Sequence, residues 1–166
     1  MAVVNTNDVL DRIVALLKTY LSADEELGGI GAQNCRPIQT IEKGWPVPGS
    51  VAVNETPCII VSYGGESDAD EYTGIQTVRE AVTVSIIEDL RDQDAALLTA
   101  LTYKDEVRTL LFKLNRKLEL NGTNDLNVVE IQPAGCSCEP TQGADEDQFL
   151  LQADVNLVVV RHHDFY

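Results

Sequence analysis

The sequence predicts an α+β fold, in which a mixed and mainly antiparallel sheet of four to five strands packs against two main α-helices. Val78, Val82, Val84 and Ile86 occupy even positions and alternate with residues such as Arg79, Thr83 and Ser85, as in a half-buried strand. Leucines between Leu97 and Leu118 recur at three- and four-residue intervals, which is helical spacing. Residues 149–160 alternate apolar and polar side chains, a pattern typical of antiparallel pairing.

Length and composition limit the classes of protein that this chain fits. Its 166 residues suit one domain, 1–166, and 44% of them are hydrophobic, which is enough for a buried core. No apolar run is long enough to cross a membrane, and the N-terminus lacks the basic and apolar regions of a secretory signal. We therefore expect a reducing cytoplasm during folding, and cysteines that are free thiols.

The charge is strongly acidic. Twenty-seven acidic residues against 12 basic ones give a net charge of −15. Tight, non-specific binding to a nucleic-acid backbone depends on Lys and Arg, so this class of function is disfavoured. An acidic surface would still let DNA slide past without sticking, although solubility alone also explains the charge.

The first helix and the segment after it contrast in regularity. Thr6 or Asn7 is expected to cap a helix whose apolar stripe ends near 22–26, because glycines follow. Prolines and glycines then exclude a long helix from 28–57, which we expect to be an extended, proline-rich segment. It is either a functional loop that wraps a partner or an unrecognised pair of strands. Trp45 is expected to anchor it by burying its ring.

The central helix follows a short acidic turn. Asp92 or Asp94 suits its start, because a carboxylate accepts hydrogen bonds from the unpaired N–H groups and lies at the positive end of the helix dipole. Basic residues near Leu118 suit its end. Thr102 and Asp105 resemble a second capping box, which predicts a kink near Tyr103.

Strand signals are separated by turn residues. The strands are expected at 38–41, 58–63, 77–87, 128–131 and 149–160. Pro133 should end the fourth of them, and prolines and glycines within 135–143 predict an irregular loop. Residues 161–166 are expected to form a C-terminal tail that is solvated or bound at an interface.

An acidic connection at 64–76 joins two of these strands. If the strands pair as a hairpin, it projects as an arm that carries Glu66, Asp68, Asp70 and Glu71. Asp68 and Asp70 have the opening spacing of a calcium loop, but the glycine comes one place late and the twelfth position is arginine instead of glutamate. The connection is either a solvated loop or an arm that contacts another subunit.

Candidate chemistry rests on Cys136 and Cys138, whose spacing suits two soft ligands. Residues that could complete a zinc site are Cys35, Cys58, His162 and His163. The usual Cys-x-x-Cys spacing is missing, however, and a free cysteine is ordinarily a small buried hydrophobe. No nucleophile has a recognisable histidine partner, so we expect a protein that is not an enzyme and that uses no cofactor or metal.

The order of the elements carries a resemblance to a known family. After an amphipathic helix and a proline-rich segment come Pro57–Val61, Gly-Gly-Glu at 64–66, Arg79–Ile87, the helical sequence Asp105–Leu111, and a final strand ending at Val158–Val160. Over residues 8–161 this order of elements and the residue types within them resemble a tail terminator of tailed bacteriophages. The resemblance implies a small α/β protein whose helices pack on a mixed or antiparallel sheet. It also implies a ring, typically hexameric, that caps the tail tube and ends its growth.

The same resemblance implies the partners. They are further copies of the chain, the tail tube protein and the head–tail connector, with DNA passing through the lumen without tight binding. No membrane is involved. The protein would assemble in the host cytoplasm and reside in the virion. Subunit contacts are predicted at Glu66, Asp68, Asp70, Glu71, Tyr72, Arg79, Arg108, His162 and His163.

Two alternatives stay open. Neck and head-closure proteins of the same particle are similar in size and in the residue types of their elements. From a different class, a small soluble metal-binding module built on Cys136 and Cys138 would fit the cysteine and histidine content.

Overall fold

The predicted fold class is confirmed: the chain is an α+β protein in which one mixed, five-stranded sheet packs against two main helices. The computed structural model describes residues 5–21, 35–72, 75–114 and 126–164. The helices and strands are α1 (Thr6–Leu21), β1 (Thr40–Lys43), β2 (Cys58–Tyr72), β3 (Ile75–Asp89), α2 (Gln93–Arg108), β4 (Val128–Gln142) and β5 (Phe149–Asp164). A 3-10 turn, η3, spans Val53–Glu55, and a π-helical segment, η4, follows α2 at Thr109–Leu114.

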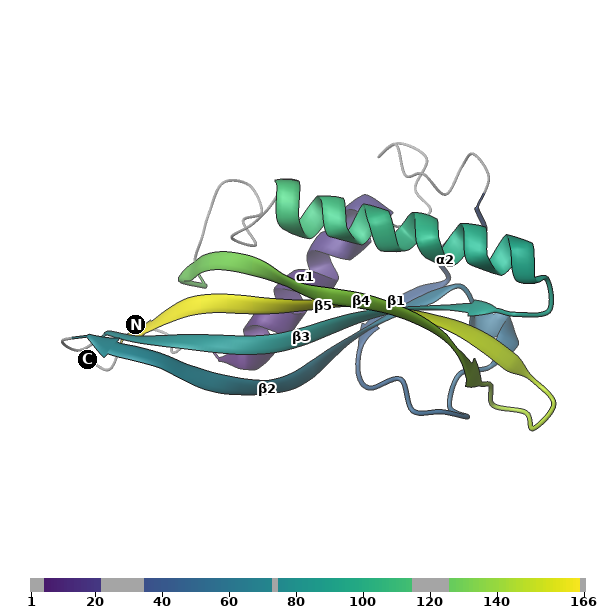
Figure 1. Cartoon of the computed structure of the whole chain (residues 1–166), viewed down its shortest axis with the longest axis horizontal. Coiled ribbons are helices and arrows are strands. Elements are labelled where there is room, and N and C mark those ends of the chain that lie inside the picture. Colours follow the sequence, from purple (N-terminus) through teal and green to yellow (C-terminus); the bar gives the residue numbers. More distant parts are fainter. Residues whose placement is uncertain (1–4, 22–34, 73–74, 115–125, 165–166) are drawn as a thin grey trace.

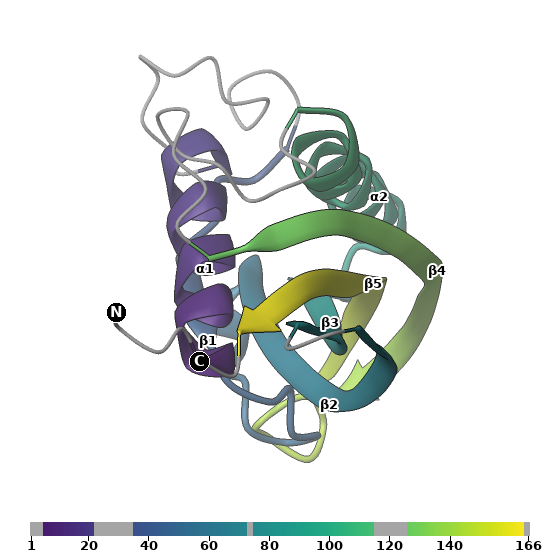
Figure 2. The ribbon, with the colours of Figure 1, turned by 90° about the vertical axis from the view of Figure 1, so that its left-hand side faces the viewer.

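The strand order is β1-β2-β3-β5-β4 (Figure 1). β1 pairs parallel with β2, and the other neighbours pair antiparallel. The sheet is strongly twisted (Figure 2), as right-handed strand twist requires. One edge is the four-residue β1 and the other is the 15-residue β4. A short and a long edge strand therefore face opposite sides of the molecule.

Both helices contribute to the core on one face of the sheet, α1 against β1 and β2, and α2 against β3 and β5. Leu17, Val84 and Val155 meet in this core and are fully buried. Burying a side chain of this size stabilises the fold by about 2 kcal/mol. A smaller cluster covers part of the opposite face, formed by Val51, Cys58, Ile60, Ile87 and Leu150.

The helix starts follow capping rules, with one shift from expectation. Asp92 is the cap of α2, since its carboxylate accepts from the Ala95 N–H at 3.1 Å. At α1 the reciprocal bonds run between Asn5 and Asp8, one residue before the expected caps. At Tyr103, where a kink was expected, α2 continues as one helix through this buried residue, and the change of pitch comes at η4.

Two expectations about the second half of the chain are wrong. Residues 135–142, expected as an irregular loop, belong to β4, which continues through Pro133. Pro is tolerated there because β4 is an edge strand with register shifts on both sides of the proline. Residues 161–164, expected as a tail, complete β5 and pair with β3, while 165–166 lie outside the described residues.

The described part of the proline-rich segment, residues 35–57, contains β1 and η3. The expected strand at 38–41 is therefore observed two residues later. Trp45 does not anchor the segment, because its ring is 67% exposed. Backbone hydrogen bonds hold the segment instead, from Gly49 N–H to the Gln142 carbonyl and from Ala144 N–H to the Val51 carbonyl, both at 2.9 Å. Residues 28–34 lie outside the described residues.

Candidate interaction surface

The acidic connection at 64–76 is a regular β-hairpin. β2 and β3 stay paired from Cys58 opposite Ile87 to Tyr72 opposite Ile75, and residues 73–74 lie outside the described residues. Figure 1 shows these strands running on past α1 to one end of the molecule. We name the part of the hairpin from Glu66 to Arg79 the arm.

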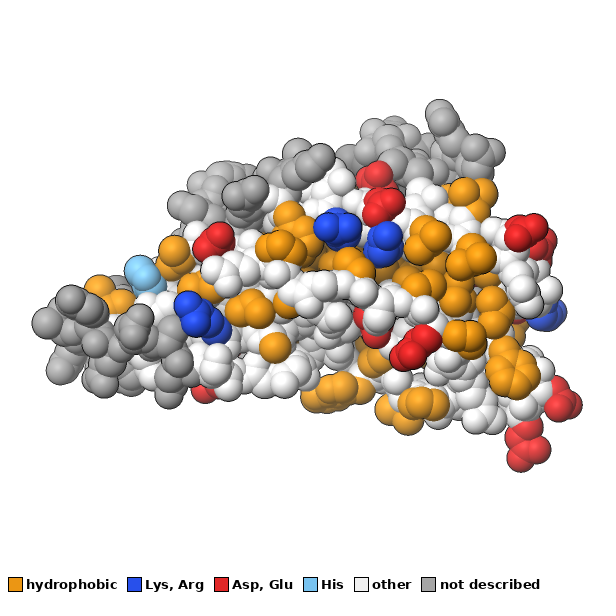
Figure 3. Space-filling model, viewed as in Figure 1, with side chains coloured by type: hydrophobic (Ala, Val, Ile, Leu, Met, Phe, Trp, Pro, Cys, Tyr) orange, Lys and Arg blue, Asp and Glu red, His pale blue; other side chains and the backbone are white. Residues whose placement is uncertain are grey.

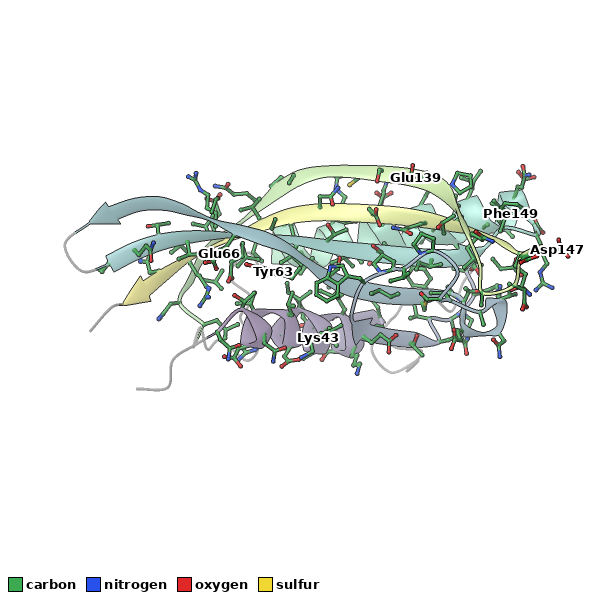
Figure 4. The ribbon with its side chains drawn as sticks, turned by 90° about the horizontal axis from the view of Figure 1, so that it is seen from below. Lys43, Tyr63, Glu66, Glu139, Asp147 and Phe149 are labelled. Atoms are coloured by element: carbon green, nitrogen blue, oxygen red, sulfur yellow. The ribbon has the colours of Figure 1, made fainter. Side chains whose placement is uncertain are left out.

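A bulge lies where the arm leaves the body of the sheet. The register shifts between Tyr63 and Gly65, and Gly65 has a φ of +119°, a conformation that side chains rarely adopt. Gly64 approaches Ala81 so closely that an added Cβ would lie 3.4 Å from the alanine Cβ. The two glycines of the sequence Gly-Gly-Glu thus bend β2 at the base of the arm. Figure 4 shows Tyr63 and Glu66 on either side of this bend.

A buried ion pair fixes the base of the arm. The Arg161 guanidinium donates to both carboxylate oxygens of Glu80, at 2.9 and 3.0 Å, and neither side chain is more than 5% exposed. The Thr6 hydroxyl at the start of α1 also donates to Glu80. Burial, and then Glu66 and Glu80, raise the pKa of the nearby Tyr63 phenol. A bidentate pair of this kind fixes geometry as well as charge.

Sequence reasoning missed this ion pair. A signal was present, because Glu80 occupies an even position in β3, within the series that faces the core. Arg161 likewise continues the core-facing series of β5 that includes Val159. A charge at a core position needs a buried partner. Which residue supplies it depends on strand register, which places Arg161 opposite Val78, two residues from Glu80.

The structure gathers most of the predicted contact residues at one end of the sheet. Glu66, Arg79 and His162 are exposed, and Arg79 lies opposite Ser67 in the hairpin. His162 pairs with Thr77 on β3. Asp68, Asp70, Glu71 and Tyr72 lie on β2 and His163 on β5, but their side chains are outside the description. The remaining predicted residue, Arg108, is exposed at the end of α2 and is not part of the arm.

A second feature is the uncovered helix-side face of β4. Cys136 pairs with Val155 and Cys138 with Ala153, so each pair points to the same face. Val155 and Ala153 are fully buried, whereas both cysteines are exposed. α2 therefore covers β5 here and leaves the second half of β4 open, whereas Val128 and Ile131 in the first half of β4 are buried in the core.

One flank of α2 borders this open face. Leu97, Leu101, Lys104 and Arg108 follow helical spacing along a single stripe. Figures 1 and 2 show α2 running alongside β4. Burial raises the pKa of the Cys138 thiol, and the charge of Lys104 acts against this. Leu97 and Leu101 are 42% and 38% exposed. We name this stripe, with Cys136, Cys138 and Pro140, the α2–β4 shelf; Figure 3 shows hydrophobic and basic side chains together along this boundary.

The cysteines are distributed over both faces of the sheet. Cys58 packs in the smaller cluster, and burial raises the pKa of its thiol to about 12. Cys35 lies half-buried against the main core, and Cys136 and Cys138 are exposed on the shelf. Within the described ranges, no group of three His, Cys, Asp or Glu side chains is arranged to hold a metal ion.

A charged cluster, also unpredicted, lies at the end of β3 away from the arm. The buried carboxylate of Glu88 accepts from Arg36 at 2.9 Å, and burial raises its pKa. Burial also opposes ionisation of the next residue, Asp89, but hydrogen bonds from Arg91 lower its pKa below the usual value. The backbone carbonyl of Arg36 accepts a hydrogen bond from the Tyr103 hydroxyl at 2.9 Å. These contacts join the end of β3 and the second half of α2 to the segment before β1.

In the described part of the chain, no helix is both long and apolar enough to span a membrane. No protein-family model and no curated protein sequence matches this chain.

Proposed function

We propose that this chain is a structural, non-enzymatic virion protein that forms a ring, with six copies, at the head-proximal end of a bacteriophage tail tube. The ring ends tube polymerisation and offers the docking surface for the head–tail connector. The observation that carries the proposal is the arm: a β-hairpin that extends beyond the helices while its base is fixed by a buried ion pair. A segment that projects from a fixed scaffold is well placed to contact a neighbouring subunit.

The fold supports the proposal. The resemblance to tail terminators implies helices packed on a mixed or antiparallel sheet, and the chain has both main helices on one face of such a sheet. This leaves the other face, the strand edges and the arm for neighbours. Fold alone does not specify function, so the support comes from the combination of fold, element order and arm.

The charge is compatible with a conduit. Each copy carries −15, and a ring with much of this charge on its inner surface would repel phosphates and let DNA pass without sticking. The same charge must be kept away from subunit interfaces or be offset there by basic residues.

The first experiment is native mass spectrometry with negative-stain imaging of the full chain at high protein concentration, in low salt and again with Mg²⁺ to screen the acidic charge. Closed rings of about six subunits with an open centre are expected. Chains that stay monomeric under both conditions, and that also fail to bind isolated tail tubes, would overturn the proposal. Rings that bind the connector but not the tube would favour the neck or head-closure alternative.

A second experiment removes the arm. Replacing Asp68–Val78, whose ends pair in the hairpin, with Asn-Gly is expected to abolish rings and leave the far-UV circular dichroism spectrum close to that of the wild type. The matched control neutralises the exposed acidic turn at the other end of the sheet, by Asp145→Asn, Glu146→Gln and Asp147→Asn, and should leave rings intact. A folded variant without the arm that still forms rings would show that the arm is dispensable.

A further inference from the structure

We propose that the α2–β4 shelf of one copy binds the acidic arm of the next copy in the ring. This inference rests on the proposed function, because it names the receiving surface for the arm. The arm and the shelf are different surfaces of the same chain, so the contact is heterologous. Repeated from copy to copy, such a contact produces a closed ring or an open filament.

The shelf is an apolar surface that the fold leaves without cover. Register places Cys136, Cys138 and Pro140 opposite β5 residues that are at most 4% exposed, yet all three are exposed themselves. On the adjoining helix, Leu97 and Leu101 add two large exposed apolar side chains. Clustered exposure of this kind, as opposed to single scattered residues, indicates a surface that contacts a partner.

Charge identifies the occupant. Residues 66–79 contain four acidic residues and one arginine, whereas residues 104–117 contain five basic and two acidic residues. In a chain with a net charge of −15, the second half of α2 and the sequence after it are thus a basic exception. Two of these basic residues, Lys104 and Arg108, lie on the shelf, where Lys104 also pairs with its neighbour Asp105 at 3.2 Å. An acidic arm from a second copy complements it, and such complementarity selects partner and orientation.

The arm also offers an apolar contact. Ile75, at the start of β3, is 42% exposed at the outer end of the hairpin. Packing it against Leu97 or Leu101 would remove apolar area from water on both copies, which stabilises the contact by about 25 cal/mol for each Å² buried. The arm thus carries acidic residues beside an exposed apolar side chain, and the shelf carries basic residues beside exposed leucines, so the two surfaces are complementary in both respects.

Addition of the arm as a sixth strand is a weaker alternative. Among the described strands, β4 pairs on one side only, so its outer edge could in principle accept a strand. Pro133 and Pro140 have no N–H to donate, however, and the register shift after Pro133 interrupts a regular ladder. Side-chain contact on the shelf avoids both obstacles.

Cross-linking tests the contact directly. The variant Ile75→Cys places a thiol on the arm, and the native Cys136 and Cys138 provide thiols on the shelf. Treatment of assembled protein with a short bis-maleimide is expected to give a ladder of covalent multimers on denaturing gels. Adding Cys136→Ser and Cys138→Ser should remove the ladder. The matched control Val47→Cys is 58% exposed but lies outside the arm, and should give none.

A charge exchange provides an independent measurement. Lys104→Glu with Arg108→Glu is expected to weaken subunit association roughly tenfold or more, measured by native mass spectrometry across a dilution series. Adding Glu66→Lys and Glu71→Lys on the arm should restore most of it. Circular dichroism of each variant checks that the fold is retained. Loss without restoration would overturn the pairing of these two surfaces.

The outcomes separate this inference from the function it rests on. Closed rings in which the thiol introduced on the arm links only to its own counterpart, or to nothing, would overturn the inference and leave the ring function standing. A ladder from open chains that never close would support the inference and count against a terminator ring.

Discussion

The two ends of the hairpin are stabilised in different ways. In the body, Val82, Val84 and Ile86 of β3 lie under the helices and are at most 1% exposed. Beyond Glu80 the same strand alternates buried Val78 with exposed Arg79, and acidic residues follow on its partner β2. Apolar burial supports the body, whereas strand pairing and one buried ion pair support the arm.

This difference shows how a small domain can extend a surface feature beyond its core. A core ends where no helix covers the sheet, and polar groups at that boundary still need partners. Here Glu80, Arg161 and Thr6 meet at that boundary, so the charge of the arm base is satisfied inside the protein. The arm is then fixed at its base, and the exposed Glu66 and Arg79 lie further out.

The largest effect is expected from breaking the ion pair. Glu80→Ala should lower the free energy of unfolding by about 3–5 kcal/mol, because it leaves Arg161 buried without its carboxylate. Urea denaturation followed by circular dichroism measures the loss. Hydrogen exchange should show that amides of the arm open before those of the body, since the affected contact lies at the arm base.

A double variant sharpens the interpretation. Glu80→Leu with Arg161→Leu removes both charges and should be far less destabilising than Glu80→Ala alone, since apolar replacement of a buried pair is often neutral. If the single variant were as stable as the wild type, the arm would not depend on the ion pair, and the contrast between arm and body would be lost.

A smaller effect is expected in the body. Asp92→Ala removes the cap of α2 and should cost about 1 kcal/mol of unfolding free energy in urea denaturation. Asp94→Ala is the matched control, because this residue is an exposed carboxylate in the same first turn and makes no capping bond, so its loss should cost only about 0.3 kcal/mol, the low end of the helix-dipole effect. Equal costs for both variants would contradict the capping role of Asp92.

The smallest effects are opposite pH dependences at two neighbouring residues. Burial raises the pKa of Glu88, so its contribution to stability is present below its ordinary value of 4.5 and is lost as pH rises through the folded pKa. Relative to wild type, Glu88→Gln should gain stability as pH rises. Arg91 lowers the pKa of Asp89, whose contribution is present above 3.8 and lost as pH falls through the folded pKa. Asp89→Asn should therefore lose relative stability as pH rises.

Urea denaturation of the two variants and the wild type, between pH 3 and 7, measures these slopes as differences. Taking differences removes the titration of the other acidic residues, which the three chains share. Slopes of the same sign would mean that the environments of Glu88 and Asp89 are not those described.

Much of the fold followed from local patterns. Period-two alternation predicted the core of β3 and the length of β5, and leucine spacing with Asp92 predicted α2. The strand predictions succeeded because one face of each strand is buried along most of its length, so the period is visible in the residues. The helix was located by a stripe that is not its buried face: Leu97, Leu98 and Leu101 are exposed, and Ala96, Ala100, Tyr103 and Val107 are buried instead.

Predictions failed where burial is absent or is set by distant residues. From Pro133 to Gln142, β4 has exposed residues at almost every position, so no apolar period marks it as a strand. Residues 64–72 were predicted as a connection for a different reason, because acidic residues and glycines usually indicate a loop. The prediction that the Trp45 ring is buried was wrong for another reason, because burial of a ring depends on which segments lie beside it.

The sequence by itself determined the fold class, the main helices, the core strands and the acidic charge, since each depends on composition or on a local period of apolar residues. It also indicated that 64–76 matters, through its run of carboxylates. Tertiary structure alone decided that this run is an arm, that Glu80 and Arg161 meet, and that β4 stays uncovered beside α2. The physical reason is register: pairing between strands far apart in the chain fixes which side chains share a face, and no local pattern encodes that choice.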